Sequence, residues 1–177
     1  QTLNDFLDYA RPRQPRQNLV DVNLVLDQVM AFLEGDLGRH GVAVEREVGP
    51  GLFVRGDKDL LYRAFYNILV NGQQAMDGTG RVRIRGGLEP DQGNGTGRVR
   101  LEFLDSGPGF DSATLPSLLD PFFTTKDGGT GLGLPIVQSI IASHRGRIEL
   151  ENGPEGGALV RVLLPAADLE APEVQDE

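Results

Sequence analysis

The chain contains no cysteine and no tryptophan, and it has only two histidines among its 177 residues. Without cysteine it cannot form a disulfide scaffold, a thiolate zinc site or a thiol nucleophile. The two histidines, His40 and His144, are too few for a histidine metal cluster. No apolar stretch approaches the roughly 20 residues that a membrane-spanning helix needs. The length predicts one domain with a hydrophobic core of its own.

Basic residues are outnumbered, with 17 Lys and Arg against 26 Asp and Glu, so the net charge is −9. A chain of this charge is a poor electrostatic partner for nucleic acid or anionic lipid. The tail from residue 166 carries five acidic residues and no basic one, and we expect it to be disordered. The chain begins with Gln1 rather than Met, so we expect it to be a fragment of a longer protein.

Hydrophobic periodicity predicts helices and strands in the N-terminal half. Apolar residues within the first ten positions recur at helical spacing, and prolines then end that helix. Asn23 is the expected N-cap of the following helix. The strongest helical pattern has an apolar stripe that includes Leu61, Phe65 and Ile68. The expected elements are a helix ending near residue 10, a linker over 11–17, strands over 19–22, 42–48 and 52–54, and helices over 24–33 and 57–76.

The C-terminal half alternates apolar and polar residues in four segments. Residues 81–88 and 99–104 predict an antiparallel hairpin with a long loop, with Val82, Ile84 and Leu88 on one face. A helix over 134–143 and strands over 147–151 and 158–164 follow. The order of elements predicts an α+β fold: a two-layer α/β sandwich in which one mixed, mostly antiparallel sheet carries helices on one face.

Two asparagines, Asn67 and Asn71, are four residues apart in the helix expected over 57–76, so they share one helical face. Their amide oxygens are hard, neutral ligands that suit Mg²⁺ bound together with phosphates. Solvated or capping asparagines would show the same spacing. The pair alone therefore leaves both interpretations open.

Asp105 follows the strand over 99–104 and opens the run Asp-Ser-Gly-Pro-Gly. A carboxylate at a strand end can accept a hydrogen bond from the exocyclic amine of a base. Gly107 and Gly109 would let the backbone approach a planar ring closely. An ordinary Asp–Gly turn is the alternative interpretation.

A glycine-rich run, Gly-Gly-Thr-Gly-Leu-Gly-Leu-Pro over residues 128–135, opens the last predicted helix. Such a loop presents free N–H groups and the positive end of a helix dipole to phosphate. Pro135 fits a helix start. The run lacks the Lys-Ser/Thr of a P-loop and does not follow a strand. A flexible linker is the alternative.

The run Phe122-Phe123-Thr-Thr-Lys126 precedes these glycines. The two aromatic rings could anchor a mobile segment to the core, and Lys126 could reach a terminal phosphate. A buried aromatic pair followed by a surface lysine is the alternative.

In this order and spacing, the four motifs resemble the catalytic ATP-binding domain of sensor histidine kinases. That family belongs to the gyrase, heat-shock chaperone, histidine kinase and mismatch-repair ATPases, which share the Bergerat-type ATP-binding fold. Residues 105–147 look most similar to the nitrogen-regulator type. Residues 3–12 resemble the end of the second helix of a dimerisation hairpin. The resemblance divides the chain into a hairpin remnant (1–11), a linker (12–18), the catalytic domain (19–165) and an acidic tail (166–177).

The resemblance implies a role for each motif. Asn71 would hold the Mg²⁺ that bridges the phosphates, and Asp105 would accept the adenine amino hydrogen bond. Asn67, which would support the triphosphate, and Lys126, the phosphate contact of a lid over residues 112–126, form the implied catalytic pair. The implied nucleotide-binding residues are Asn67, Asn71, Asp105, Gly107, Gly109, Phe123, Thr125, Lys126, Gly129, Thr130, Gly131, Leu132 and Gly133.

One position departs from the family pattern, because Gly72 stands where alanine usually follows the magnesium asparagine. Glycine weakens a helix by roughly 0.5–1 kcal/mol but removes no ligand. In hydrolytic relatives a glutamate activates water one turn before the magnesium asparagine. Here that residue is Asn67, which cannot act as a base, so transfer to a protein histidine is favoured over hydrolysis.

The resemblance also implies cofactors and partners. ATP and Mg²⁺ are the expected cofactors, and a cytoplasmic location is expected whether or not the parent protein is anchored in a membrane. We expect the phospho-accepting histidine to lie upstream in the dimerisation hairpin, because His40 falls in a turn and His144 suits the end of a helix. The expected partners are that hairpin and a response regulator receiver domain, with no nucleic acid. The parent is expected to be a homodimer and this fragment a monomer.

Three other functions are alternatives to a histidine kinase. An ATP-hydrolysing clamp would release phosphate without a partner. A degenerate kinase would bind nucleotide and act only as a scaffold, which the intact motifs disfavour. A serine-kinase anti-sigma factor shares the fold, but the Phe-Phe-Thr-Thr-Lys run and the helix remnant before the catalytic domain favour the histidine kinase.

Overall fold

A computed structural model of the chain describes residues 15–77, 79–90, 97–125 and 129–168. The elements, in chain order, are β1 (Asn18–Asp21), α2 (Val22–Arg39), β2 (Val42–Val48), β3 (Phe53–Gly56), α3 (Lys58–Ala75), β4 (Gly80–Glu89), β5 (Arg98–Asp105), the 3₁₀ helix η1 (Leu115–Ser117), α4 (Gly133–Ser143), β6 (Arg147–Asn152) and β7 (Ala158–Pro165). The helix expected over the first ten residues and most of the acidic tail lie outside the described ranges.

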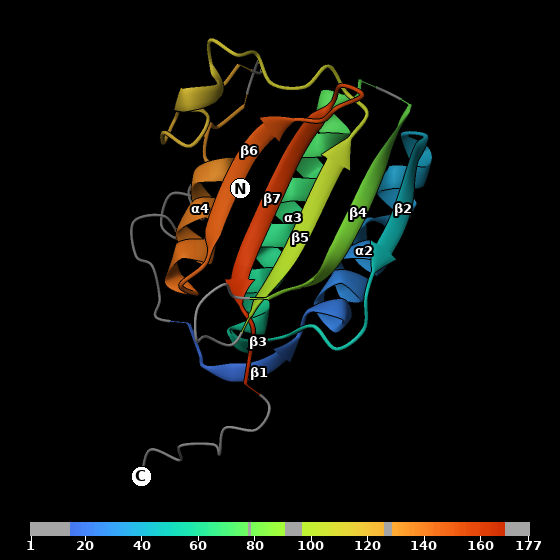
Figure 1. Ribbon diagram of the computed structural model, residues 1–177. Coiled ribbons are helices and arrows are strands. Elements are labelled where there is room, and N and C mark those ends of the chain that lie inside the picture. Colours follow the sequence, from blue (N-terminus) through green and yellow to red (C-terminus); the bar gives the residue numbers. More distant parts are fainter. Residues whose placement is uncertain (1–14, 78, 91–96, 126–128, 169–177) are drawn as a thin grey trace.

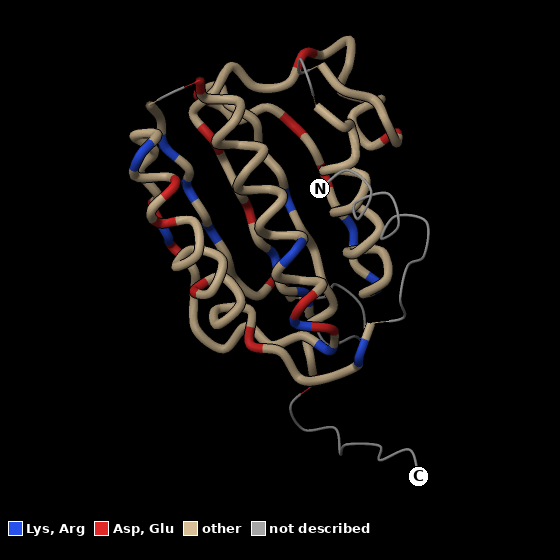
Figure 2. Tube along the Cα trace, turned by 180° about the vertical axis from the view of Figure 1, so that it is seen from behind, with Lys and Arg blue, Asp and Glu red and all other residues tan. Residues whose placement is uncertain are grey.

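The described elements form two layers (Figure 1). One layer is a five-stranded sheet in the order β2-β4-β5-β7-β6, in which only β2 and β4 run parallel. Helices α2, α3 and α4 cover one face of this sheet, as the view from behind shows (Figure 2). The predicted α+β sandwich is therefore confirmed. None of the helices in the described part of the chain is long and apolar enough to cross a bilayer.

A second, two-stranded sheet pairs β1 with β3, from Asn18 opposite Gly56 to Asp21 opposite Phe53. The strands at these positions were expected, but not their separate pairing. The Val22 N–H donates to the Leu52 carbonyl at 2.9 Å. The small sheet thus joins the start of α2 to the segment that leads into α3.

Helix α2 corrects the prediction at both ends. Its N-cap is Asp21, whose side chain accepts from the Asn23 N–H at 2.9 Å, whereas Asn23 had been expected to cap. Asn23 instead donates its side-chain amide to the Gly49 carbonyl at 3.0 Å. The helix also continues past residue 33 to Arg39, because packing of the buried Leu37 outweighs the low helix propensity of the glycines around it.

Helix α3 lies at the centre of the core and matches its prediction closely, with Asp57 as N-cap and Met76 as C-cap. Its apolar stripe is buried, and the Phe65 ring lies 5.8 Å from the ring of Phe103 on β5. Leu88 shares the face of β4 that carries the buried Val82 and Ile84, as expected. It is nevertheless 57% exposed, because it lies near the far end of that strand.

The outer face of the sheet carries an Arg–Glu network. Arg161 on β7 donates to Glu102 on β5 at 3.1 Å and to Glu149 on β6 at 2.8 Å. The hydrogen bond from Arg161 holds the pKa of Glu149 below its ordinary value. Between these charges Leu163 is buried. Paired charges therefore occupy this part of the outer face.

His144 connects the end of helix α4 to the start of helix α3. It follows α4, is 4% exposed, and accepts from the Asp57 N–H through Nε2 at 2.9 Å. Its Nδ1 lies 2.7 Å from the Ile140 carbonyl, so that nitrogen is the donor. His144 thus lies at the end of a helix, as expected, and is the C-cap of α4. The ring fixes the end of α4 against the start of α3.

Replacing His144 by alanine is expected to lower the free energy of unfolding by about 2–4 kcal/mol, because it leaves a cavity and deprives the Asp57 N–H of its acceptor. Urea denaturation of the two chains measures the difference. His40→Ala is the matched control: its side chain is 54% exposed. The control should change stability by less than about 1 kcal/mol. Equal effects of the two substitutions would contradict the structural role of His144.

Candidate nucleotide-binding site

Three of the predicted motifs converge at one end of the molecule. Strand β5 ends there, the C-terminal half of α3 lies beside it, and α4 begins there (Figure 1). The segment between β5 and α4 runs over the same end. Sequence-distant motifs are thus brought together around the C-terminal turns of α3.

Asp105 is the last residue of β5 and is 8% exposed. Its Oδ1 accepts from the Gly107 N–H at 2.9 Å and from the Ala158 N–H at 3.0 Å. Within the described ranges, both hydrogen bonds to this carboxylate end on Oδ1. A Cβ added to Gly72 would lie 3.6 Å from Oδ2, which therefore faces helix α3. The carboxylate thus presents Oδ2 as an acceptor while Oδ1 holds the backbone.

The glycines after Asp105 are required by their surroundings. A Cβ at Gly107 would lie 3.0 Å from Asp105 Oδ1 and 3.3 Å from the Ala75 carbonyl oxygen. Gly109 has φ +79°, and its Cβ would lie 2.6 Å from Asn152 Oδ1. Close approach to a planar ring was the expected reason for these glycines. The structure adds a second reason, which is the approach of the protein's own polar groups.

Asn71 lies against the start of α4. A Cβ added to Gly133, the first residue of α4, would lie 3.0 Å from Asn71 Nδ2. Leu132, the N-cap, supplies no side-chain hydrogen bond to the first turn of α4. The positive end of the α4 helix dipole therefore lies beside Asn71. Asn67 is half-buried one turn earlier on α3.

The segment expected to form a lid is attached through its backbone to the glycine loop that precedes α4. The Phe122 N–H donates to the Gly131 carbonyl at 3.0 Å. Gly131 has φ +66°, and its Cβ would lie 2.5 Å from the Phe122 carbonyl carbon. Phe122 is 59% exposed, so its ring does not form the expected core anchor, and neither is the aromatic pair buried. Phe123 is half-buried.

The remaining predicted residues differ in exposure. Thr125, Gly129 and Thr130 are exposed, and Lys126 lies outside the described ranges. Leu132 is buried, so its side chain packs in the core and only its backbone faces the loop. The Leu132 N–H donates to Thr130 Oγ1 at 3.3 Å.

The sequence interpretation missed Asn152, Gly157 and Ala158, which complete the surroundings of Asp105. Gly157 has φ +81°, and a Cβ there would overlap the Asp105 carbonyl oxygen. The glycine-rich run over 152–157 predicted a turn but gave no sign that the turn packs on Asp105.

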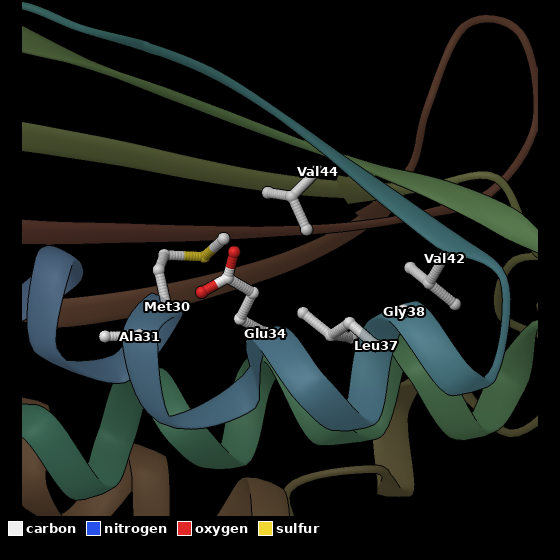
Figure 3. A pocket seen from close by; sticks show the side chains of 7 residues that line it. All are labelled: Met30, Ala31, Glu34, Leu37, Gly38, Val42 and Val44. Atoms are coloured by element: carbon white, nitrogen blue, oxygen red, sulfur yellow. The ribbon is translucent and has the colours of Figure 1, made fainter.

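A groove of about 460 Å³ opens elsewhere, between α2 and the edge strand β2 (Figure 3). Its lining is mostly aliphatic, and Glu34 is its one charged side chain. It contains none of the residues predicted to bind nucleotide. An acidic, aliphatic groove is a poor match for a polyphosphate, so we place the candidate site at the end of β5 instead.

Comparison with known proteins identifies the family to which the fold belongs. Residues 56–168 match the family described as histidine kinase-, DNA gyrase B-, and HSP90-like ATPase. The chain is 34% identical over 95% of its length to the sensory histidine kinase/phosphatase NtrB of Rhodobacter capsulatus, and 32% identical over 93% to the nitrogen regulation protein NtrY of Azorhizobium caulinodans. It spans 49% and 21% of those two proteins.

Solved structures show the same fold. The mycobacterial sensor histidine kinase MprB is 27% identical, with a TM-score of 0.74 over 86% of this chain and 99% of that one. The histidine kinase ThkA, solved in complex with the response regulator protein TrrA, is 24% identical, with a TM-score of 0.78 over 94% of this chain and 46% of that one.

The chain therefore belongs to the histidine kinase-, DNA gyrase B-, and HSP90-like ATPase family, as the motifs implied. Within that family its curated relatives include sensor histidine kinases of the nitrogen-regulation type. Membership of an ATPase family identifies the domain as one that uses ATP.

Gly72→Ala is expected to raise the free energy of unfolding by about 0.5–1 kcal/mol, because alanine is the better helix former. The added Cβ would lie 3.5 Å from Asp105 Cβ, which is ordinary contact, so ATP affinity should not change. Thermal unfolding and ATP titration measure the two quantities. Gly157→Ala is the contrasting control and should destabilise, since its Cβ has no room. Weaker ATP binding by Gly72→Ala would show that this position must stay open.

Proposed function

We propose that this chain is the catalytic domain of a sensor histidine kinase, which binds Mg-ATP and transfers the γ-phosphoryl group to a histidine of a dimerisation hairpin. One observation carries the proposal. Consecutive residues of α3 contact the two elements that would bind the nucleotide: Asn71 lies against the start of α4, and Gly72 lies against Asp105. A base held at Asp105 would thereby direct its phosphates toward the N–H groups of α4.

The proposed base site is the Oδ2 of Asp105. An ionised carboxylate only accepts hydrogen bonds, so it matches the amino group of adenine and opposes the carbonyl oxygen that guanine has at that position. Gly107 and Gly109 would form the adjoining wall. Base selectivity would then reside in one buried oxygen atom.

The proposed phosphate site is the start of α4 with the loop before it. Gly129, Thr130, Gly131, Leu132 and Gly133 would supply backbone N–H groups to the phosphates. Phe123 and Thr125 would border this site from the preceding segment. Lys126 remains a sequence-based expectation as the phosphate contact of the lid.

Asn71 is the proposed protein ligand for Mg²⁺. The donor set fits, because a neutral amide oxygen leaves Mg²⁺ free to keep waters and phosphate oxygens in its octahedral shell. The part of the chain that the structure describes holds no cluster of three or more acidic or histidine side chains that could bind a metal instead. When bound, Mg²⁺ would neutralise charge on the phosphates, while Asn67 would steady the triphosphate one turn away.

Phosphoryl transfer is favoured over hydrolysis by the identity of Asn67. An amide cannot take a proton from water, and residues 60–66 contain no carboxylate. Transfer through a loose transition state depends on positioning and charge neutralisation more than on a strong base. An ATP-hydrolysing clamp, the second candidate, lacks such a base in this part of α3.

The histidine that accepts the phosphoryl group would belong to the hairpin. Both ring nitrogens of His144 are engaged, and the side chain is buried, so it cannot attack ATP. His40 follows α2 and contacts the Asp36 carbonyl. Residues 1–11 would be the end of the hairpin, 12–18 the linker, 19–165 the catalytic domain and 166–177 an acidic tail.

The proposed partners follow from the relatives. ThkA was solved in complex with a response regulator protein, and we infer a response regulator receiver domain as the partner of the whole protein here. The parent would be a cytoplasmic or membrane-anchored homodimer joined through the hairpin. A fragment with little of that hairpin would be a monomer.

The test is to follow the γ-phosphate of labelled ATP with the chain alone and with a separate hairpin polypeptide that carries the acceptor histidine. Label on the hairpin with little free phosphate is the expected result. Asn71→Ala should abolish labelling and the Mg²⁺ dependence of ATP binding while leaving the thermal midpoint unchanged. Rapid phosphate release by the chain alone would establish hydrolysis and contradict the kinase function.

Asp105→Asn is expected to weaken ATP binding by about tenfold or more and to lower the preference for ATP over GTP, because an amide N–H₂ would face the adenine amino group. The amide oxygen can still accept from Gly107 and Ala158, so the fold should be retained. Titrations with ATP and GTP measure the ratio of the two dissociation constants. An unchanged ratio would refute the base-binding role of Asp105.

A further inference from the structure

Asn152, the last residue of β6, holds the loop after Asp105 by two hydrogen bonds to one residue. Its Oδ1 accepts from the Phe110 N–H at 2.6 Å, and its Nδ2 donates to the Phe110 carbonyl at 2.9 Å. The two residues are 42 positions apart in the chain. The Asn152 amide therefore pairs with the Phe110 backbone as a residue of a neighbouring β-strand would.

Only an amide of this length can make both bonds. A backbone N–H needs an acceptor and a backbone carbonyl needs a donor, and an Asn side chain supplies one of each. An aspartate would keep the first bond and set a negative oxygen against the Phe110 carbonyl. The contact also explains Gly109, because a Cβ there would lie 2.6 Å from Asn152 Oδ1.

The hydrogen bonds of Asn152 and Asp105 connect both ends of the loop to the β6–β7 turn. Asn152 pairs with Ala158 across β6 and β7. The Ala158 N–H donates to Asp105 Oδ1, which also accepts from Gly107. The Asp105 carboxylate thus holds the start of the loop over residues 107–110, and the Asn152 amide holds its end. Both groups lie beside the β6–β7 turn.

We propose that Asn152 is a positioning residue of the nucleotide site, whose amide fixes residues 107–110 in the shape that receives the base. The inference rests on the proposed function, since it assigns the loop to adenine. Asn152 is exposed, so core packing does not explain its contact with Phe110. Asn152 would raise affinity by increasing the fraction of nucleotide-free molecules in which residues 107–110 already have the binding conformation.

Asn152→Asp and Asn152→Leu are the test variants, because the first keeps only the acceptor and the second keeps the size without either bond. Asn18→Asp is the matched control, since it adds the same charge at an exposed asparagine on β1, at the opposite end of the molecule (Figure 1). Equilibrium titration with ATP and with ADP measures affinity. Amide hydrogen exchange of the nucleotide-free chain measures the loop, and thermal unfolding measures the whole fold.

Both Asn152 variants are expected to bind ATP and ADP about tenfold more weakly, and equally so, because the base and not the γ-phosphate is affected. Amides of residues 107–114 should exchange about tenfold faster, with exchange in β5 and β7 unchanged. The thermal midpoint should fall by no more than about 5 °C. Asn18→Asp should alter none of these.

Three results would overturn the inference in different ways. Faster loop exchange with unchanged affinities would make Asn152 a structural residue only, and the proposed function would stand. A loss of affinity that appears only with a large fall of the thermal midpoint would also refute positioning. If the unaltered chain bound neither nucleotide, the proposed function would be wrong and the positioning role would fall with it.

Discussion

The buried carboxylate of Asp105 is the interaction on which the rest of the site depends. A charged group removed from water must be hydrogen-bonded, and two backbone N–H groups from different segments meet that need on one oxygen. Strand β5, the loop that follows it and the start of β7 are held together in this way. The second oxygen faces α3, so the same group that orders the backbone also provides an acceptor for a ligand.

Helix α3 sets the separation between the two ends of the site. Asn71 and Gly72 are adjacent, and they contact α4 and Asp105 respectively, so one rigid helix would fix the distance between the proposed base and phosphate sites. The orientation of α4 is fixed at its other end by His144, which binds the N-cap of α3. His144, at the C-terminal end of α4, thus helps to orient the N-terminal end of that helix, where phosphate would bind.

Periodicity and turn chemistry were sufficient to predict most elements and the end of β5 where Asp105 lies. They failed where tertiary packing outweighs local preference. Helix α2 continues through two glycines because Leu37 is buried, and its cap is Asp21 because the β1–β3 pairing sets where the helix begins. The glycine motifs indicated close approach, but the approaching group, Asn152, is 42 residues from its partner, and no local pattern encodes that contact.

The two ends of the site differ in how much of their geometry exists before ligand binds. The base end is built from a buried carboxylate, paired backbone groups and glycines in contact with their neighbours. The phosphate end is bordered by exposed residues, among them Thr125, Gly129 and Thr130, and η1 contributes no buried side chain. The proposed base site would therefore be largely preorganised, while the proposed phosphate site would gain more of its contacts from the ligand. An enzyme that transfers the terminal phosphoryl group gains from this division, because the contacts that order the segment are lost with the group that leaves.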